Sequence, residues 1–458
     1  MKERFELLEK AILTMVEDKK YATLRDILVT VNPADIAGIF NSLDDKRIPL
    51  MFRLLPKELA AETFVEMEPE DQELLIRGFS DNELKEVLDE LYVDDAVDII
   101  EEMPANVVRR ILTQADPEMR KSINQILRYP ENSAGAWMTT EYVSLRPSMT
   151  VEEAILRIRR QGVDKETIYT CYVTKDRKLL GIVTVKDLLL AEDDEMLISD
   201  LMVTELISVN THTDQEEVAS MFSKYDFLAM PVVDNENRMV GIVTVDDAID
   251  VMEEEATEDI ELMGGMLPSE DTYLRSSVWE LFKNRIRWLL DLMLSATFTG
   301  MIINGFEDAL ATQMVLSAFI PMLMGTGGNS GSQSSVTIIR ALSLDEVEFS
   351  DLPKVVWKEI RTAVICGLAL SVVCFIKIWL VDRLLFGNPD ITLMVDAVVC
   401  LAMFVTVLLA KTVGAVLPMV AKVLKLDPAV MASPFITTIV DALSLLIYFL
   451  FATMLLGI

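Results

Sequence analysis

One acidic residue, Asp441, lies within an otherwise apolar segment near the C-terminus, DPAVMASPFITTIVDALSLLIYFLF. An ionised carboxylate at the centre of a membrane costs on the order of 3 kcal/mol, so it must face a pore or a partner. Thr437 and Ser433 precede Asp441 by one and two helical turns and therefore share its helix face. Carboxylate, hydroxyl and carbonyl oxygens suit a hard cation such as Mg²⁺, which keeps several of its waters. The spacing predicts an oxygen-lined pathway for a divalent cation.

Two arrangements would keep the Asp441 carboxylate ionised. One carboxylate makes a poor cage, so two chains paired about an axis along the pathway would bring two Asp441 side chains to one hydrated ion, which predicts a homodimer. Alternatively, Asp441 forms a buried ion pair with Lys411, which lies in the preceding apolar segment.

A second polar segment, PMLMGTGGNSGSQSS, runs from Pro321 to Ser335 and breaks up another apolar stretch. Its glycines, with Asn329 and Gln333, predict a non-helical or closely approached backbone, which a membrane tolerates where it lines a water-filled cavity. The alternative is that small residues only allow helices to pack closely. Packing alone does not require the two amides, so we favour the cavity lining.

An acidic run precedes the apolar part of the chain. Between residues 246 and 266, acidic side chains without compensating Lys or Arg recur at three- and four-residue spacing along one helix face: Asp247, Asp250, Glu254, Glu258 and Glu261. Such like charges destabilise one another. A charge run is often only a solvated face. Divalent cations would, however, relieve the repulsion by bridging it to a second acidic surface, such as DELYVDDAVDIIEEM at 89–103.

The composition excludes several classes of protein. His212 is the only histidine, which removes His-based zinc sites and His-dependent catalytic triads. The four cysteines, Cys171, Cys366, Cys374 and Cys400, have no metal-ligand spacing and are expected to be free thiols. A net charge of −32 repels nucleic acid and attracts cations. We expect a protein that is not an enzyme and does not bind nucleic acid.

The acidity belongs to one part of the chain. Residues 1–282 carry 29 Lys+Arg against 60 Asp+Glu, whereas residues 283–458 carry 12 against 13. A membrane-spanning helix needs about 20 mostly apolar residues. The second region predicts an α-helical transmembrane domain with five helices, near Ile286–Phe306, Met314–Ile339, Ile360–Phe386, Thr392–Val423 and Pro428–Leu456. Pro418 predicts a kink or an early exit in the fourth helix.

Lys and Arg in the short connections predict the orientation, because positively charged loops remain cytoplasmic. They precede the first span and lie between the second and third and between the fourth and fifth: Lys283, Arg285, Arg287, Arg340, Lys354, Lys358, Arg361, Lys422 and Lys425. The N-terminus lacks the apolar core of a signal peptide. We expect a multi-pass protein of the cell membrane with a cytoplasmic N-terminus and an extracytoplasmic Ile458.

The acidic part of the chain divides into two patterns. As far as Arg128, prolines recur at short intervals after polar turns, as in LLPKELAAETF and ADPEMRKSI, which predicts an all-α superhelical array of short helices. Beyond it, LLGIVTVKDLL (Leu179–Leu189) and MVGIVTVDDAI (Met239–Ile249) repeat at an offset of 60 residues, as Gly181 and Gly241 show. Each copy predicts a β-hairpin followed by a helix.

The repeat resembles the paired cystathionine-β-synthase (CBS) domains, an α+β fold in which Gly-Ile-Val-Thr is followed by an aspartate. The resemblance implies adenine-nucleotide contacts at Thr184 with Asp187 and at Thr244 with Asp247, which makes ATP a candidate ligand. Alternatively, the pair is only a dimerising scaffold, because a fold does not fix a function.

The whole chain resembles the MgtE-type magnesium transporter family, through GTGGNSGSQSS, the DPA at 427–429 and PFITTIVDALSLLIYF. The resemblance implies a homodimeric, Mg²⁺-selective channel in which Asp441 binds hydrated Mg²⁺. It also implies a helical N domain at 1–130, CBS domains at 131–199 and 200–256, a connecting or plug helix at 257–282, and the pore domain at 283–458.

The resemblance assigns roles to further residues. Supporting pore contacts map onto the Thr437 carbonyl, Ser433 and Asn329, although some relatives have asparagine in place of Ser433. Carboxylates that sense Mg²⁺ map onto nine positions: Glu62, Asp94, Asp98, Asp247, Asp250, Glu255, Glu258, Asp259 and Asp427. High internal Mg²⁺ would neutralise these groups, compact the cytosolic domains and close the pore.

Three other functions fit parts of the sequence. A CBS-regulated anion channel would need basic or amide-lined sites at mid-membrane, which Asp441 argues against. A proton-coupled carrier would use Asp441 as a titrating relay. A membrane-tethered nucleotide sensor would tolerate Asp441→Ala without loss of ion flux.

Overall fold

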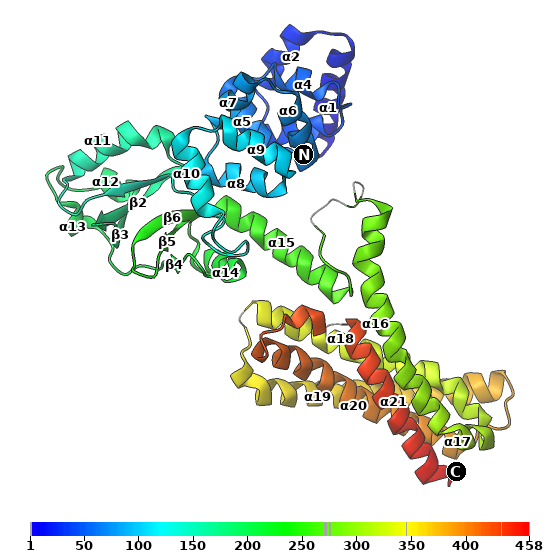
Figure 1. The fold of residues 1–458 in the computed structure, drawn as a ribbon. Coiled ribbons are helices and arrows are strands. Elements are labelled where there is room, and N and C mark those ends of the chain that lie inside the picture. The colour runs from blue at the N-terminus through cyan, green and yellow to red at the C-terminus, as the bar shows by residue number, and fades with distance from the viewer. Residues whose placement is uncertain (1, 270–272, 274–275, 345, 432, 458) are drawn as a thin grey trace. The chain divides into compact units, whose positions relative to one another are not determined.

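The computed structural model describes residues 2–269, 273, 276–344, 346–431 and 433–457, without the side chains of residues 2–4, 164 and 433. The chain forms two compact units, Met1–Met252 and Glu253–Ile458. Each is described by itself below, and Figure 1 gives the order of their elements.

Short helices follow one another through the first part of unit 1. They are α1 (Lys2–Glu17), α2 (Tyr21–Leu28), α3 (Pro33–Phe40), α4 (Ile48–Phe52), α5 (Lys57–Val65), α6 (Pro69–Gly78), α7 (Asp81–Leu88), α8 (Val93–Glu102), α9 (Ala105–Gln114) and α10 (Pro117–Ile126). Proline occupies the first turn of several of them, where its missing amide hydrogen costs no hydrogen bond. Asp116 caps α10 by accepting from the amide of Met119 at 3.1 Å. The expected all-α array is confirmed.

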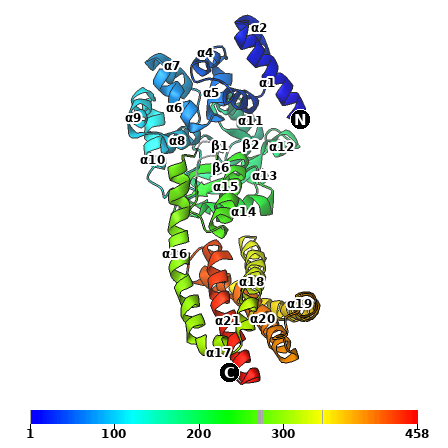
Figure 2. The same ribbon diagram turned by 90° about the vertical axis from the view of Figure 1, so that its right-hand side faces the viewer.

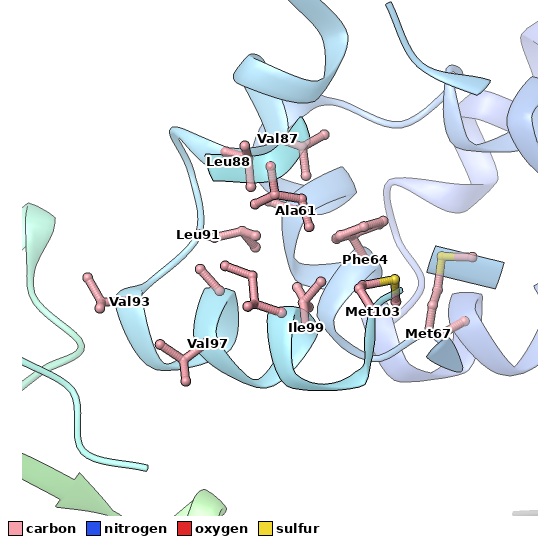
Figure 3. Packing of buried hydrophobic residues seen from close by; sticks show 14 of the residues in the cluster. Ala61, Phe64, Met67, Val87, Leu88, Leu91, Val93, Val97, Ile99 and Met103 are labelled. Atoms are coloured by element: carbon pink, nitrogen blue, oxygen red, sulfur yellow. The ribbon is translucent and has the colours of Figure 1, made fainter. Parts of the chain in front are cut away.

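A continuous apolar core joins these helices. Figure 3 shows Ile99 of α8 on the side that faces Phe64 of α5 and Leu88 of α7. The same core extends to buried residues of the second CBS domain. The packing of these apolar residues fixes α8 in the core, and Asp94 of the same helix is buried as well.

Two small sheets make up the rest of unit 1. The first has the order β1-β2-β3, with β1 (Tyr142–Leu145) parallel to β2 (Thr167–Lys175) and β3 (Lys178–Thr184) antiparallel to β2. The second repeats this with β4 (Val209–Asn210), β5 (Ala229–Val233) and β6 (Met239–Thr244). The associated helices are α11 (Val151–Gln161), the 3₁₀ turn η1 (Gly162–Asp164), α12 (Val185–Leu189), α13 (Ile198–Leu201), α14 (Gln215–Tyr225) and α15 (Val245–Met263). The predicted hairpin and helix, used twice, are confirmed.

The repeated glycine has a steric reason. A Cβ on Gly241 would lie 2.6 Å from the carbonyl oxygen of Thr139, and one on Gly181 would lie 3.0 Å from that of Val203. Each hairpin therefore passes close to a neighbouring backbone, which only glycine permits.

Unit 2 consists of long helices. They are α16 (Val278–Gly305), α17 (Glu307–Thr312), α18 (Ile320–Ser343), α19 (Leu352–Lys377), α20 (Leu393–Val423) and α21 (Ser433–Leu456), with the shorter 3₁₀ or π segments η2 (Met314–Phe319), η3 (Phe349–Asp351), η4 (Ile378–Leu385) and η5 (Pro428–Met431). In the described part of the chain, four segments are long and apolar enough to cross a membrane: Val278–Gly305, Phe349–Leu385, Leu393–Val423 and Pro428–Leu456. The remaining long helix, α18, has a buried stripe of glycine and serine and packs against α20 and α21 (Figure 2).

Two local expectations named two outcomes each, and in each case the structure contradicts one of the two: a non-helical backbone in the glycine-rich segment and an early end of the helix that carries Pro418. The glycine-rich segment does not break its helix, because α18 runs without interruption from Ile320 to Ser343. Its glycines instead allow close contact: a Cβ on Gly414 of α20 would lie 2.2 Å from the carbonyl oxygen of Gly331. Likewise, α20 does not end early at Pro418 but continues to Val423, since Pro418 is buried in the helix packing.

Candidate cation sites

The Asp441 carboxylate lies where α21 meets α18. A Cβ built on Gly328 of α18 would be 2.3 Å from Cγ2 of Thr437 and 3.9 Å from Oδ1 of Asp441. The two helices therefore touch through glycine at this level, and only glycine leaves room for both side chains. Among the described residues, Oδ1 of Asp441 is buried and has no hydrogen-bond partner. A half-buried carboxylate with a free oxygen is available to a cation or to water that a cation carries.

Lys411 does not neutralise Asp441. The ammonium group of Lys411, which is 6 % exposed, lies 3.4 Å from the hydroxyl oxygen of Ser334. That hydroxyl donates at 2.7 Å to Oε2 of Glu359 on α19. The lysine thus belongs to a polar contact among α18, α19 and α20, and the ion pair considered from the sequence is not formed.

The other expected pore residues are placed differently. The Thr437 hydroxyl donates to the Pro434 carbonyl at 3.2 Å, which keeps this side chain close to its own helix. Asn329 follows Gly328 directly and is exposed on this chain. The side chain of Ser433 lies outside the described part of the structure. The structure therefore brings Thr437 and Asp441 together beside α18, while Asn329 faces outward.

A second group of carboxylates gathers in unit 1, where α8 meets the start of α15 and the first CBS domain. It comprises Asp94, Asp95 and Asp98 of α8, Asp246 and Asp247 of α15, and Glu141 and Glu166 beside the first sheet. We call it the acidic cluster. Oε2 of Glu141 accepts from the Val93 amide at 3.1 Å and from the Thr139 hydroxyl at 3.0 Å, which ties the N-terminus of α8 to the CBS domain.

Ionising the buried carboxyl groups of the acidic cluster is energetically unfavourable. Burial and the neighbouring charges of Asp247 and Asp95 raise the pKa of Asp94 well above its usual range. Asp94 is only 5 % exposed, and its Oδ1 has no hydrogen-bond partner in the described structure. Burial, followed by like charges, also raises the pKa of Asp95 to about 7 and that of Glu166 to about 8.

Asp247 has a further constraint. Burial raises its pKa to about 6, although the Thr244 hydroxyl donates to its Oδ2 and favours the ionised form. The corresponding residues of the first repeat, Thr184 and Asp187, form a complete capping box at the start of α12, with the Asp187 amide donating to the Thr184 hydroxyl at 3.1 Å. The expected nucleotide contacts are therefore residues that already begin helices.

The sequence missed several members of the acidic cluster. Asp95, Asp246, Glu141 and Glu166 were not among the expected sensor residues. Glu141 and Glu166 belong to the CBS sequence, far from the two acidic runs, so spacing carried no signal for them. Conversely, the expected Glu62 is an exposed residue of α5 with no recorded contact to the cluster. Glu66 of the same region lies within range of the Asp250 charge instead.

A third acidic group lies within unit 2. The charge of Asp427 acts on both Glu258 and Asp259 near the end of α15, and that of Glu255 acts on Glu258. Burial and these charges raise the pKa of Glu258 and of Asp259. The Ser343 hydroxyl of α18 donates to Oδ2 of Asp259 at 3.3 Å. The structure therefore brings together four of the expected sensor residues.

In the described ranges, no three Asp, Glu, Cys or His side chains lie close enough to coordinate one bare ion. The carboxylates are nevertheless near enough to shift one another's pKa. That separation suits Mg²⁺, which dehydrates reluctantly and is often held through its own water molecules.

Family models match nearly every part of this architecture. The MgtE intracellular N domain matches residues 31–132, the CBS domain matches 134–194 and 198–254, and the MgtE divalent cation transporter domain matches 320–451. "Magnesium transporter MgtE" of Thermus thermophilus is 36 % identical over 438 residues, covering 94 % of this chain and 95 % of that protein. The chain belongs to the MgtE family. The Bacillus subtilis MgtE is 33 % identical, covering 96 % of each chain.

Solved structures agree with this for about half of the chain. A crystal structure of the cytosolic domain of the Mg²⁺ channel MgtE in complex with ATP is 36 % identical and superimposes with a TM-score of 0.51. It covers 53 % of this chain and 99 % of its own. The soluble part of a magnesium transporter, at 31 % identity, also gives a TM-score of 0.51. As a member of the MgtE family, the chain is a transporter and not an enzyme.

Proposed function

We propose that this MgtE protein conducts Mg²⁺ across the cell membrane as a homodimer, and that its acidic cytosolic groups close the pathway when internal Mg²⁺ is high. The observation that carries the proposal is the Asp441 carboxylate, which has a free buried oxygen beside Gly328 and is not neutralised by Lys411. Two chains paired along α18 and α21 would place two such carboxylates around one hydrated ion.

The pore-lining groups act by position and charge. Asp441 offers a negative charge, with Thr437 one turn before it and the exposed Asn329 available to a second chain. One carboxylate per chain holds a hydrated ion weakly enough for it to leave again, which conduction requires. The inside-negative membrane potential would drive entry with about 2.3 kcal/mol per charge per 100 mV, or about twice that for Mg²⁺.

Closure follows from the acidic groups of the cytosolic part. Seven carboxylates of the acidic cluster repel one another in a half-buried site, so their compact arrangement is unfavourable when all are ionised. Regulatory Mg²⁺ would supply positive charge there and at Glu258, Asp259 and Asp427. For near-complete closure, Mg²⁺ must bind the closed state about 10⁴-fold more tightly than the open state. Several sites that each bind Mg²⁺ somewhat better in the closed state can provide this ratio together.

Two finer assignments belong to the same proposal. The N-terminus and the acidic units are cytoplasmic, as the Lys and Arg of the connections predict. ATP is a candidate ligand of the CBS pair, because a structure of 36 % identity was solved with it. The expected nucleotide contacts also form hydrogen bonds at the starts of α12 and α15, so a bound nucleotide would have to share these side chains with the helix caps: Thr184, Asp187, Thr244 and Asp247.

Mg²⁺ influx into liposomes containing the purified protein tests the pore assignment. We expect Asp441→Asn to lower the initial rate at least tenfold, because the amide cannot attract a divalent ion. The control is Asp382→Asn, which removes a partly buried carboxylate paired with Lys377 at 2.7 Å and should leave the rate within twofold. Equal rates for Asp441→Asn and wild type would refute the assignment. Uptake driven by a pH gradient alone would favour the proton-coupled carrier.

A further inference from the structure

A cavity of about 600 Å³ opens on the first CBS domain, along the exposed side of α11 and the loop that precedes it. Its lining differs from the rest of this acidic chain, because it includes Arg146, Arg157 and Arg160 together with Ser148 and Gln161. All of these residues belong to unit 1. We call it the arginine cleft. Figure 1 shows α11 at the edge of this unit, away from α8.

Local structure brings the three arginines together. Arg157 and Arg160 are three residues apart on α11 and therefore project from neighbouring turns of one face. Arg146 directly follows β1, whose last residue is buried in the core of the first CBS domain. Helix α11 and the end of β1 are both held in place by core packing, so the fold itself brings the three positive charges together.

The acidic residue of the cleft does not neutralise these charges. Oε2 of Glu153 accepts from the Thr150 amide at 3.2 Å, and the Glu153 amide donates to the Thr150 hydroxyl at 3.2 Å. This capping box fixes the N-terminus of α11 and directs the carboxylate toward the cap.

Several other arginines of unit 1 have protein partners. Arg53 binds Glu83 at 2.7 Å, Arg110 binds Asp81 at 3.2 Å, and Arg120 donates to the Ala115 carbonyl at 2.8 Å. By contrast, no hydrogen bond or ion pair is recorded for the arginines of the cleft within the described residues.

The strongest sign of a missing acceptor is at Arg157. Its Nε is buried and has no hydrogen-bond partner in the described structure. A buried donor without an acceptor is unfavourable by about 1–3 kcal/mol, and more when it carries charge. A chain of net charge −32 offers many carboxylates that could have filled this place, yet none does.

We propose that the arginine cleft binds a phosphate-bearing anion, of the size of an inorganic or nucleotide polyphosphate. Guanidinium groups present planar pairs of N–H donors that match phosphate oxygens, and three of them can engage two or more phosphates at once. The hydroxyl of Ser148 and the amide of Gln161 add neutral donors. A cavity of about 600 Å³ falls in the range of small-molecule sites.

This site is separate from the nucleotide contacts considered above. Thr184 with Asp187 and Thr244 with Asp247 begin α12 and α15 and do not line the arginine cleft. The proposal therefore does not depend on ATP binding at those caps, nor on Mg²⁺ conduction.

Binding of inorganic tripolyphosphate to the purified full-length protein tests the proposal, measured by calorimetry in Mg²⁺-free buffer. We expect saturable binding that weakens when salt is raised from 50 to 200 mM, because the contacts are between charges. The double variant Arg157→Gln/Arg160→Gln should bind at least tenfold more weakly, and Arg146→Gln about threefold to tenfold more weakly. Arg157→Lys, which keeps the charge but loses the planar pair of donors, should fall between these and wild type.

Two control variants make the result specific. Arg159→Gln removes a neighbouring arginine of α11 that does not line the cleft, and Asp187→Asn alters the expected nucleotide contact. Both should bind tripolyphosphate within twofold of wild type. With ATP as the probe, the arginine variants should weaken binding in the Asp187→Asn background as well. The thermal midpoint of each variant without ligand should equal or exceed that of wild type, since removing like charges relieves repulsion.

Three results would overturn the proposal. One is the absence of tripolyphosphate binding by wild type at low salt. Another is equal affinity for wild type and the double arginine variant. The third is a combination of two observations: wild type does not bind tripolyphosphate, and light scattering shows the double variant to be a monomer where wild type is a dimer. That combination would show that carboxylates of a second copy fill the cleft.

Discussion

The acidic cluster and the surroundings of Asp441 differ in how many carboxylates they bring close together. The cluster gathers seven carboxylates from three parts of the chain, and burial raises the pKa of Asp95 to about 7 and of Glu166 to about 8. Asp441 instead lies beside Gly328 and Thr437. Because the carboxylates of the acidic cluster repel one another, its compact arrangement requires bound cations. A single carboxylate, as at Asp441, binds a cation weakly enough for the ion to leave again. Under the proposed function, the number and crowding of carboxylates would distinguish the Mg²⁺ sensor from the conduction pathway.

The largest effect is expected from the glycines that let the pore helices touch. Gly414→Val should prevent folded protein from accumulating, because its Cβ would lie 2.2 Å from the Gly331 carbonyl oxygen. Gly325→Ala is the matched control, since nothing lies within 4 Å of its added Cβ. The yield of monodisperse protein in detergent measures both. A normal yield of Gly414→Val would show that α18 and α20 do not cross as described.

Removing charge from the acidic cluster should make the protein more resistant to protease, whereas the glycine substitution should reduce the yield of folded protein. Asp94→Asn with Asp95→Asn lowers the repulsion within the cluster, so unit 1 should resist protease without Mg²⁺. Added Mg²⁺ should then slow cleavage less than twofold, against at least fivefold for wild type. Glu86→Gln, an exposed partner of Lys57, is the control and should behave like wild type. If the double variant still needs Mg²⁺ for protection, the cluster is not the sensor.

Protons should partly replace Mg²⁺ in the cluster. Five of its carboxyls have pKa values raised above the unfolded value of about 4, so the compact state binds protons more tightly: Asp94, Asp95, Asp98, Glu166 and Asp247. Its stability should therefore rise as pH falls from 8 to 6, through the pKa values of about 8, 7 and 6 for Glu166, Asp95 and Asp247. Thermal midpoints in EDTA at the two pH values measure this. A midpoint that falls on acidification would contradict the account.

The smallest effect is expected from the two helix caps. Thr184→Ala and Thr244→Ala should each lower the free energy of unfolding by about 1 kcal/mol through loss of a cap. Only Thr244→Ala removes a hydrogen bond from a carboxylate of the acidic cluster, so only it should change the Mg²⁺ concentration at half-protection, by about twofold to threefold. The same change in Thr184→Ala would mean that the effect comes from general destabilisation.

Much of the fold follows from local pattern. Proline positions and repeated GIVT motifs predicted the short helices and the doubled hairpin, because these signals act within a few residues. The helix face of Thr437 and Asp441 was predictable for the same reason. The helical state of the glycine-rich segment was not, since the packing of α18 against α20 and α21 decides it.

The partners of charged residues were harder to predict. Glu141 and Glu166 reach the acidic cluster only through the packing of α8 on the CBS domain, which no spacing encodes. Lys411 meets Ser334 because glycines bring α18 and α20 together. The arginine cleft likewise depends on a loop and a helix that fold onto one sheet.

The most direct test of the division of roles is the initial Mg²⁺ influx of three proteins over a range of internal Mg²⁺: wild type, Asp441→Asn, and Asp94→Asn with Asp95→Asn. Wild type should conduct at low internal Mg²⁺ and close as it rises. Asp441→Asn should conduct at least tenfold more slowly than wild type throughout, while its unit 1 still gains protease protection from Mg²⁺. The double variant should retain the ability to conduct, with an influx that no longer depends on internal Mg²⁺. Influx through Asp441→Asn at the wild-type rate, or wild-type dependence on internal Mg²⁺ in the double variant, would contradict the account.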